Sequence, residues 1–258
     1  MMTLTHRLDR TITIKAPPAL VFAFLTETPR WASWWGPGSE IDARPGGRMK
    51  IRYPEGTEAI GEVLEVSAPR RLVFTYGYAT GALIPPGGSR VTIDLEPEGA
   101  ATRIRLTHEF ADAKVRDQHV QGWRYQLSLF ANAVANVVFA GAADTVDAWF
   151  EAWAEPDAEA RHRMLARIAS PDVRFRDQYS SIDTIADLAA HIAGAQQFMP
   201  GIRMRRAGDV RQCQGVVLAD FVAQAADGTR RAAGTNVFVF HADGLLDSVI
   251  GFMNRSTP

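Results

Sequence analysis

The first candidates for a binding site are three tryptophans, Trp31, Trp34 and Trp35, which fall within five residues of one another. A tryptophan ring buries a large apolar area but keeps an N–H group that needs a hydrogen-bond partner. The glycine-rich break 36–38 follows them directly. This pattern predicts either the wall of an apolar cavity or a plug that closes the end of a hydrophobic core.

Arg44 is the one charged residue near these tryptophans that suggests a ligand contact. It precedes a second glycine-rich turn, 45–47, and a guanidinium in such a position can pair with a ligand carboxylate. An ion pair with Asp42 or Glu40 is the structural alternative. The spacing alone leaves both roles open.

The histidines and acids of the first half do not form a catalytic set. His108 and Glu109 close a predicted strand, and strand alternation places neighbouring side chains on opposite faces. His119 falls near the start of a predicted helix, where the helix dipole disfavours its protonated form and a solvated position is expected. No spacing in the chain is typical of a metal site or of a phosphate-binding loop, so neither a metal nor a cofactor is expected.

Length and composition limit the class of protein. The chain has 258 residues and a formal net charge of −1. Two domains are therefore expected, and a nucleic-acid or membrane partner is not, because both need a basic surface. The single cysteine, Cys213, excludes a disulfide within the chain. No apolar run approaches the ~18 residues of a membrane span, and no signal peptide is recognisable, so a cytoplasmic location is expected.

Hydrophobic spacing predicts an α+β first half. A strand over 7–16 and a short helix over 19–26 precede the tryptophans. An apolar stripe over 118–139 predicts a long helix, which needs a sheet to pack against. Between them, five segments at hairpin spacing indicate an antiparallel meander: 48–53, 59–67, 71–78, 89–97 and 102–110.

These segments resemble the START-like, or helix-grip (SRPBCC), superfamily. The stretches PPALVFAFLTET, WASWWGPGSEIDARPGGRMKI and GEVLEVSAPRRLVFTY and a late Gly122-Trp123 occur in the order seen in the family named after the activator of heat-shock protein 90 ATPase. The resemblance covers residues 8–138. It implies a curved sheet that grips a long C-terminal helix around an apolar cavity, where some superfamily members bind lipids, hormones or polyketides. The candidate ligand contacts of this half are Trp31, Trp34, Trp35, Arg44 and Trp123.

A run of small residues, 140–143, marks the predicted boundary, so domains are expected over 1–139 and 140–258. The second half is predicted to hold three helices and one short strand, followed by four long strands with Asp-Gly hairpin turns. This order predicts an α+β cone. The helices are predicted over 145–154, 158–169 and 184–198, and the strands over 173–177, 202–212, 216–226, 229–241 and 245–252.

The second half resembles the nuclear transport factor 2-like superfamily, which includes SnoaL-like polyketide cyclases and ketosteroid isomerase. The segments SPDVRFRDQ, FMPGI and NVFVFHADGLLDSV carry the resemblance over residues 143–253. In ketosteroid isomerase an aspartate just after the first strand is the general base, and Asp177 matches it by register. Asn236 takes the place of the acid that donates a hydrogen bond to the oxyanion. A tyrosine completes that set, but Trp149 or Phe150 stands here, so the triad is incomplete.

Asp177 also has a structural alternative, since its carboxylate is placed to cap the loop 178–181. Alternation puts Asn236 on one strand face with Phe238, where a buried amide needs a partner. The candidate ligand contacts of this half are Trp149, Tyr179 and Phe238.

Three functions remain open. The favoured one is a soluble protein that binds a small apolar or aromatic molecule in one or both cavities, because neither half has a complete catalytic set. The second is a cyclase, isomerase or hydrolase that uses Asp177 as general base with Asn236 as a hydrogen-bond donor. The third is a chaperone-associated stress protein. A homodimer through the outer face of the second sheet is expected, with docking of that face onto the first domain as the alternative.

Overall fold

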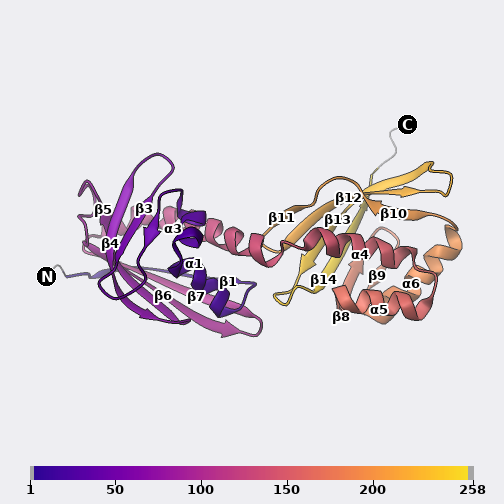
Figure 1. Ribbon diagram of the computed structural model, residues 1–258, viewed down its shortest axis with the longest axis horizontal. Coiled ribbons are helices and arrows are strands. Elements are labelled where there is room, and N and C mark those ends of the chain that lie inside the picture. The colour runs from indigo at the N-terminus through magenta and orange to yellow at the C-terminus, as the bar shows by residue number, and fades with distance from the viewer. Residues whose placement is uncertain (1–2, 255–258) are drawn as a thin grey trace. The chain divides into compact units, whose positions relative to one another are not determined.

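The computed structural model describes residues 3–254 and divides the chain into two compact units, with the division between Ala135 and Asn136 (Figure 1). Each unit contains a seven-stranded sheet, so the predicted α+β class with two domains is confirmed. The boundary expected after residue 139 stays a prediction. Within the second unit, Gln212 Nε2 donates a hydrogen bond to Asn136 Oδ1 at 2.9 Å.

The first unit is an antiparallel sheet followed by one long helix. Its strands follow the order β1-β7-β6-β5-β4-β3-β2, and every neighbouring pair is antiparallel. The elements are β1 (His6–Ile14), α1 (Pro18–Thr26), α2 (Thr28–Trp35), β2 (Glu40–Ile41), β3 (Arg48–Arg52), β4 (Glu58–Ser67), β5 (Arg71–Tyr78), β6 (Ser89–Glu98), β7 (Ala101–Phe110) and α3 (Ala113–Val138).

Strand β7 shows how alternation builds the core of this unit. Ile104, Leu106, His108 and Phe110 are buried, while the residues between them are more exposed. Burying a side chain of the size of Leu106 or Phe110 stabilises a fold by about 1.5–3 kcal/mol. This register also decides that His108 points inward and Glu109 does not, as strand alternation predicted.

The tryptophan helix α2 ends at Gly36, where the chain must turn sharply. Gly36 has φ of +136°, and a Cβ atom there would lie 2.5 Å from the backbone oxygen of Arg52. Only glycine fits so close to a neighbouring strand with this backbone conformation. The predicted glycine-rich break is therefore a close contact between the end of α2 and β3.

The long helix α3 begins at Ala113, five residues before the predicted start at 118. Asp112 caps it, since its Oδ1 accepts hydrogen bonds from the backbone N–H groups of Lys114 at 2.8 Å and Val115 at 3.0 Å. These bonds lower the pKa of the Asp112 carboxyl. The prediction followed the apolar stripe, which starts one turn after the polar cap.

The second unit has three helices and a mixed sheet. Its strands follow the order β10-β12-β13-β14-β8-β9, and β11 also pairs with β12. The elements are α4 (Ala142–Ala154), α5 (Ala158–Ile168), β8 (Ala169–Arg176), β9 (Ser181–Ile182), α6 (Ile185–Phe198), β10 (Arg203–Arg206), β11 (Arg211–Cys213), β12 (Val216–Gln224), β13 (Arg230–Phe240) and β14 (Leu246–Met253).

Two features of this sheet differ from the sequence prediction. The strand expected over 202–212 is divided into β10 and β11, with Gly208 between them at φ +80°. The short strand β8 pairs in parallel with β14, whereas the other pairs of this sheet are antiparallel. Local spacing predicts that β8 exists, but it cannot identify a partner about 75 residues later in the chain.

Within residues 3–254, no single helix is long and apolar enough to cross a membrane. The consecutive helices α3 and α4 meet that criterion of length and composition only when they are taken together.

Candidate functional site

A partly open cavity of about 1190 Å³ lies in the first unit. One wall is the face of α3 from Gln118 to Leu129, and the others come from β5, β7, the end of α2 and the loops that follow β3 and β5. Its aromatic lining residues are Trp35, Tyr53, Tyr76, Tyr78, Trp123 and Tyr125, together with His108 and His119.

Tyrosine marks this cavity more clearly than tryptophan does. The chain has five tyrosines, and four of them line the cavity. A tyrosine offers a large apolar ring and a polar hydroxyl, which suits a wall that faces both a core and a ligand. None of these four, Tyr53, Tyr76, Tyr78 and Tyr125, was predicted from the sequence, although the clustering of tyrosines before residue 126 was a usable signal.

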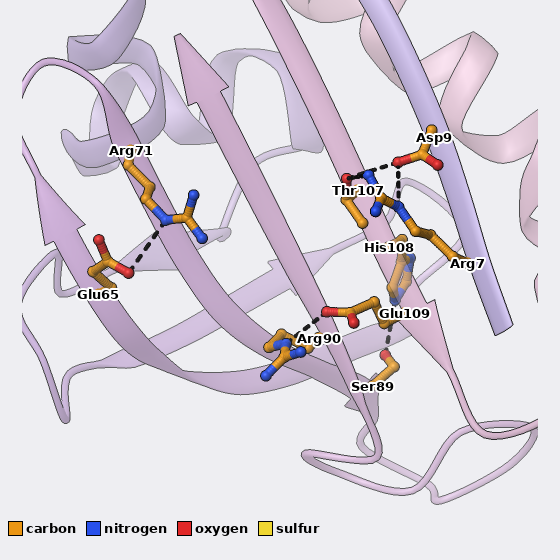
Figure 2. A network of polar contacts seen from close by, with 9 residues as sticks. All are labelled: Arg7, Asp9, Glu65, Arg71, Ser89, Arg90, Thr107, His108 and Glu109. Atoms are coloured by element: carbon orange, nitrogen blue, oxygen red, sulfur yellow. Dashed lines mark hydrogen bonds and ion pairs between the residues drawn. The ribbon is translucent and has the colours of Figure 1, made fainter. Parts of the chain in front are cut away.

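A chain of hydrogen bonds fixes the buried His108 at the cavity wall. Trp123 Nε1 donates to His108 Nδ1 at 2.9 Å, so Nδ1 must be the unprotonated nitrogen. His108 Nε2 lies 2.8 Å from Ser89 Oγ (Figure 2) and carries the remaining proton. Ser89 Oγ in turn donates to the backbone oxygen of Tyr76 at 2.8 Å. Burial and the nearby His119 hold the pKa of His108 well below its usual value.

The direction of these bonds argues against a serine nucleophile. A general base would accept the serine proton, but here the imidazole donates to Ser89 and the serine proton is used by a carbonyl oxygen. The other ring nitrogen is already occupied by Trp123. His108 therefore acts as a neutral structural link between β7, β6 and α3.

The position of His119 differs from the one predicted from the sequence. It was expected at a solvated helix end, but it is only partly exposed and lines the cavity. Its Nδ1 donates to the backbone oxygen of Val115 at 2.7 Å, which leaves Nε2 to accept from the Tyr78 hydroxyl at 3.4 Å. Burial lowers the pKa of His119 and favours the neutral ring. The extra first turn of α3, started by Asp112, is what moves this residue away from the helix end.

Two more hydroxyls meet inside the cavity. Tyr53 Oη and Tyr76 Oη are 3.0 Å apart, and either of them can be the donor. Burial raises the pKa of both phenols well above their usual value, so both stay neutral. They can donate to or accept from a ligand, but they supply no charge.

The three clustered tryptophans have different environments in the structure. Trp31 and Trp34 are buried in the core, where their indole N–H groups donate to the backbone oxygens of Lys50 at 3.3 Å and Phe24 at 3.0 Å. Trp35 lines the cavity, and its buried Nε1 has no hydrogen-bond partner among the described residues. Trp35 thus forms part of the cavity wall, whereas Trp31 and Trp34 fill the core. The two alternatives considered for the cluster apply to different residues of it.

Of the two other candidates of the first half, one lines the cavity and the other does not. Trp123 lines the cavity and is held by His108. Arg44 is 77 % exposed, pairs with Asp42 at 2.8 Å and is not among the residues that line the cavity. The structure thus shows the ion pair that was the alternative for Arg44.

The outer face of the first sheet carries ion pairs rather than a site. Arg90 Nε lies 2.7 Å from Glu109 Oε2, and Arg71 Nε lies 3.2 Å from Glu65 Oε2 (Figure 2). Exposed pairs of this kind contribute about 0–1 kcal/mol each to stability. Glu109 therefore has a partner on the face opposite to His108.

In the second unit, Asp177 and Asn236 lie close together. A Cβ atom built on Gly251 would be 3.2 Å from Asn236 Oδ1 and 3.5 Å from Asp177 Cβ. Asn236 is buried on β13 opposite Gly251 of β14, and Asp177 directly follows β8. The Asp177 carboxylate also accepts a hydrogen bond from the backbone N–H of Tyr179 at 2.8 Å, as the loop-capping alternative expects.

The remaining candidates of this unit lie partly in its core. Trp149 is 1 % exposed and Phe238 is 0 % exposed, and their rings meet edge to face at 5.9 Å. Tyr179 is 79 % exposed at the surface. Among residues 3–254, no group of three or more His, Cys, Asp or Glu side chains is arranged to hold a metal ion.

Comparison with known families identifies the first unit. Residues 15–135 match the family described as Activator of Hsp90 ATPase homolog 1-like protein, so the predicted family is confirmed for this domain. No curated protein sequence matches the chain. The likeness of the second unit to the nuclear transport factor 2-like superfamily stays a prediction.

Solved structures with similarity to the chain include three of interest. A protein of Agrobacterium tumefaciens str. C58, named as a SnoaL-like isomerase, is 26% identical, with 43% of this chain and 96% of that chain covered and a TM-score of 0.42. CalU16 of Micromonospora echinospora is 23% identical, covering 52% and 79%, with a TM-score of 0.43. The Aha1 dimer of Colwellia psychrerythraea is 18% identical, covering 50% and 96%, with a TM-score of 0.45. These likenesses do not identify the function of this chain.

Proposed function

We propose that the first unit binds a small apolar or aromatic molecule in the cavity between α3 and the sheet. The observation that carries this proposal is the cavity of about 1190 Å³ with its aromatic wall. Ligand sites are typically concave and mostly apolar, with a few polar groups that orient the ligand. The Tyr53 and Tyr76 hydroxyls supply such groups.

The chemistry of the lining favours binding over catalysis. Both nitrogens of His108 are used within the wall, and the buried phenols are held neutral. A nucleophile with an available base is therefore not present among these groups. What the residues can do is enclose a ligand, exclude water and fix its orientation.

Gly122 offers a direct test of this proposal. It lies in the middle of α3, lines the cavity, and a Cβ atom there would meet nothing within 4 Å. A larger side chain at this position therefore projects into free space rather than into packed core. Glycine within a helix costs about 1 kcal/mol relative to alanine, so the substitution Gly122→Phe is expected to leave the fold intact.

The test is equilibrium dialysis of the full chain against the neutral probe 2-naphthalenemethanol. We expect the unchanged protein to bind the probe and Gly122→Phe to weaken binding by about tenfold or more, which corresponds to 1.4 kcal/mol. Gly194→Phe is the matched control, since Gly194 lies in helix α6 of the second unit with equally free space. No binding by the unchanged protein, or equal binding by Gly122→Phe, would contradict the proposal.

A second candidate function rests on the approach of Asp177 and Asn236 at Gly251. We propose it as proton abstraction next to a carbonyl group, with Asp177 as base and the Asn236 amide as donor to the developing oxyanion. Incubation with cyclohexanone in D₂O, followed by NMR, measures α-deuterium incorporation. Asp177→Asn should remove any acceleration over buffer, whereas equal rates for both proteins and buffer would eliminate this candidate.

A further inference from the structure

Resting on the proposed binding function, we propose that the cavity of the first unit selects a ligand with an aromatic or apolar body and a cationic ammonium group, and discriminates against carboxylates. Two features of the lining support this preference, its formal charges and its aromatic rings.

The lining carries negative charge only. It contains two carboxylates, Glu55 and Glu58, and no lysine or arginine. Neither carboxylate forms a side-chain hydrogen bond or ion pair with another described residue, in contrast to the paired acids on the outer face such as Glu109. These two unpaired carboxylates thus give the lining a negative formal charge.

Both carboxylates lie on a part of the lining that solvent reaches. Glu55 is exposed in the loop after β3 and Glu58 is partly exposed at the start of β4, so both belong to one hairpin. Glu55 lies near the Tyr53 phenol, whose pKa is raised mainly by burial and also by the Glu55 charge. An ammonium group at this edge would be attracted, while a carboxylate would be repelled by the same charges.

The other polar groups of the lining do not offset this charge. Burial lowers the pKa of His119 and so favours its neutral form. The phenols of Tyr53 and Tyr76 are held neutral. A ligand carboxylate would therefore find no cationic partner in the cavity.

The aromatic rings favour a cation for an independent reason. The face of an indole or phenol ring is the negative end of its quadrupole, and it attracts an ammonium group within about 6 Å by roughly 0.5–2 kcal/mol. Tyr125 of α3 is 65 % exposed and lines the cavity, and the indoles of Trp35 and Trp123 lie in its wall. A lining that combines aromatic rings with unpaired carboxylates suits a quaternary ammonium group.

The test uses three naphthalene probes of matched size and different charge. They are 2-naphthylmethyl-trimethylammonium, 2-naphthalenemethanol and 2-naphthoate, each titrated calorimetrically into the full chain at neutral pH and low salt. We expect the ammonium probe to bind about fivefold more tightly than the alcohol, because one or two partly screened charge contacts contribute a free energy of this size. The carboxylate probe should bind more weakly than both.

Variants locate the source of the preference. The double variant Glu55→Gln/Glu58→Gln should bring the ammonium and alcohol affinities to within about twofold of each other. Glu62→Gln is the control, because Glu62 is exposed on the same strand β4 but does not line the cavity; it should keep the preference.

The outcomes separate this inference from the proposed function. Equal affinity for all three probes, or tighter binding of the carboxylate, would overturn the charge preference and leave the binding function standing. A preference that survives in the double variant would overturn the assigned role of Glu55 and Glu58. Failure of all three probes to bind would overturn the proposed function itself.

Discussion

Both units pack aromatic rings between helices and a sheet, but they use them differently. In the first unit, Tyr53, Tyr76 and Tyr78 line a cavity and keep their hydroxyls hydrogen-bonded there. In the second, Trp149 and Phe238 are almost completely buried against each other. The number of aromatic residues therefore does not locate a cavity. Aromatic residues with polar tips and a small residue such as Gly122 on the facing helix are the more informative signals.

The largest expected difference between the units is the cost of removing a ring. Phe238→Ala should destabilise the second unit by about 3–5 kcal/mol, because it leaves a hole in packed core. Tyr125→Ala should cost the first unit less than about 0.5 kcal/mol, as is usual for surface substitutions, since its ring is 65 % exposed at the cavity. Urea unfolding followed by the indole NMR signals of Trp149 and Trp123 reports each unit separately. A similar loss of unfolding free energy in Phe238→Ala and Tyr125→Ala would contradict the assignment of Phe238 to packed core and of Tyr125 to a cavity wall.

The next effect is a dependence of first-unit stability on pH. The pKa of the buried His108 is depressed in the folded state, by burial and by His119, so the unfolded chain binds more protons as the pH falls below 6.5. The free energy of unfolding of the first unit should therefore decrease as the pH is lowered through this range. The contribution of neutral His108 to the free energy of unfolding is fully present above the pKa that this residue has in the unfolded chain. It is lost as the pH falls toward the lower pKa of the folded state.

His108→Gln tests the origin of this slope. The variant should be less stable at neutral pH by about 1–3 kcal/mol, because Trp123 or Ser89 loses a buried partner, and its stability should change less between neutral and mildly acidic pH. His162→Gln, at an exposed position of the second unit, should keep the original slope. An unchanged slope in His108→Gln would show that other groups cause it.

The smallest expected effect concerns the open space beside α3. Gly122→Ala should stabilise the first unit by about 0.5–1 kcal/mol through helix propensity. Because one methyl group occupies little of the cavity, binding of 2-naphthalenemethanol should change by less than about twofold. Thermal unfolding and dialysis measure the two quantities, and a loss of stability would mean that position 122 is more crowded than the structure shows.

Much of the fold follows from local patterns in the sequence. The hairpin strands of the first unit were predicted to within a few residues, because period-2 alternation and proline- or glycine-rich turns are local signals. The start of α3 was predicted too late, since Asp112 caps it outside the apolar stripe. The parallel pairing of β8 with β14 depends on contacts between distant segments, which no local pattern encodes.

The candidate site was only partly predictable. Trp35 and Trp123 were named from clustering and from the family resemblance, and both line the cavity. The same clustering also selected Trp31 and Trp34, which are core residues, because sequence spacing does not tell which ring faces a void. Tyr53 comes from the loop after β3, Tyr76 and Tyr78 from β5, and Tyr125 from α3, and only the folded chain brings them to one cavity.

Ligand binding in the first unit can be tested by comparing the indole N–H signals of all six tryptophans in a ¹H–¹⁵N NMR spectrum before and after addition of 2-naphthalenemethanol. We expect the largest shift at Trp35, which lines the cavity and whose indole N–H has no hydrogen-bond partner among the described residues, and a smaller one at Trp123, whose N–H is held by His108. Trp149 and Trp153 of the second unit should not move. Shifts confined to Trp149 and Trp153, with Trp35 unchanged, would contradict the central claim that the first unit holds the ligand.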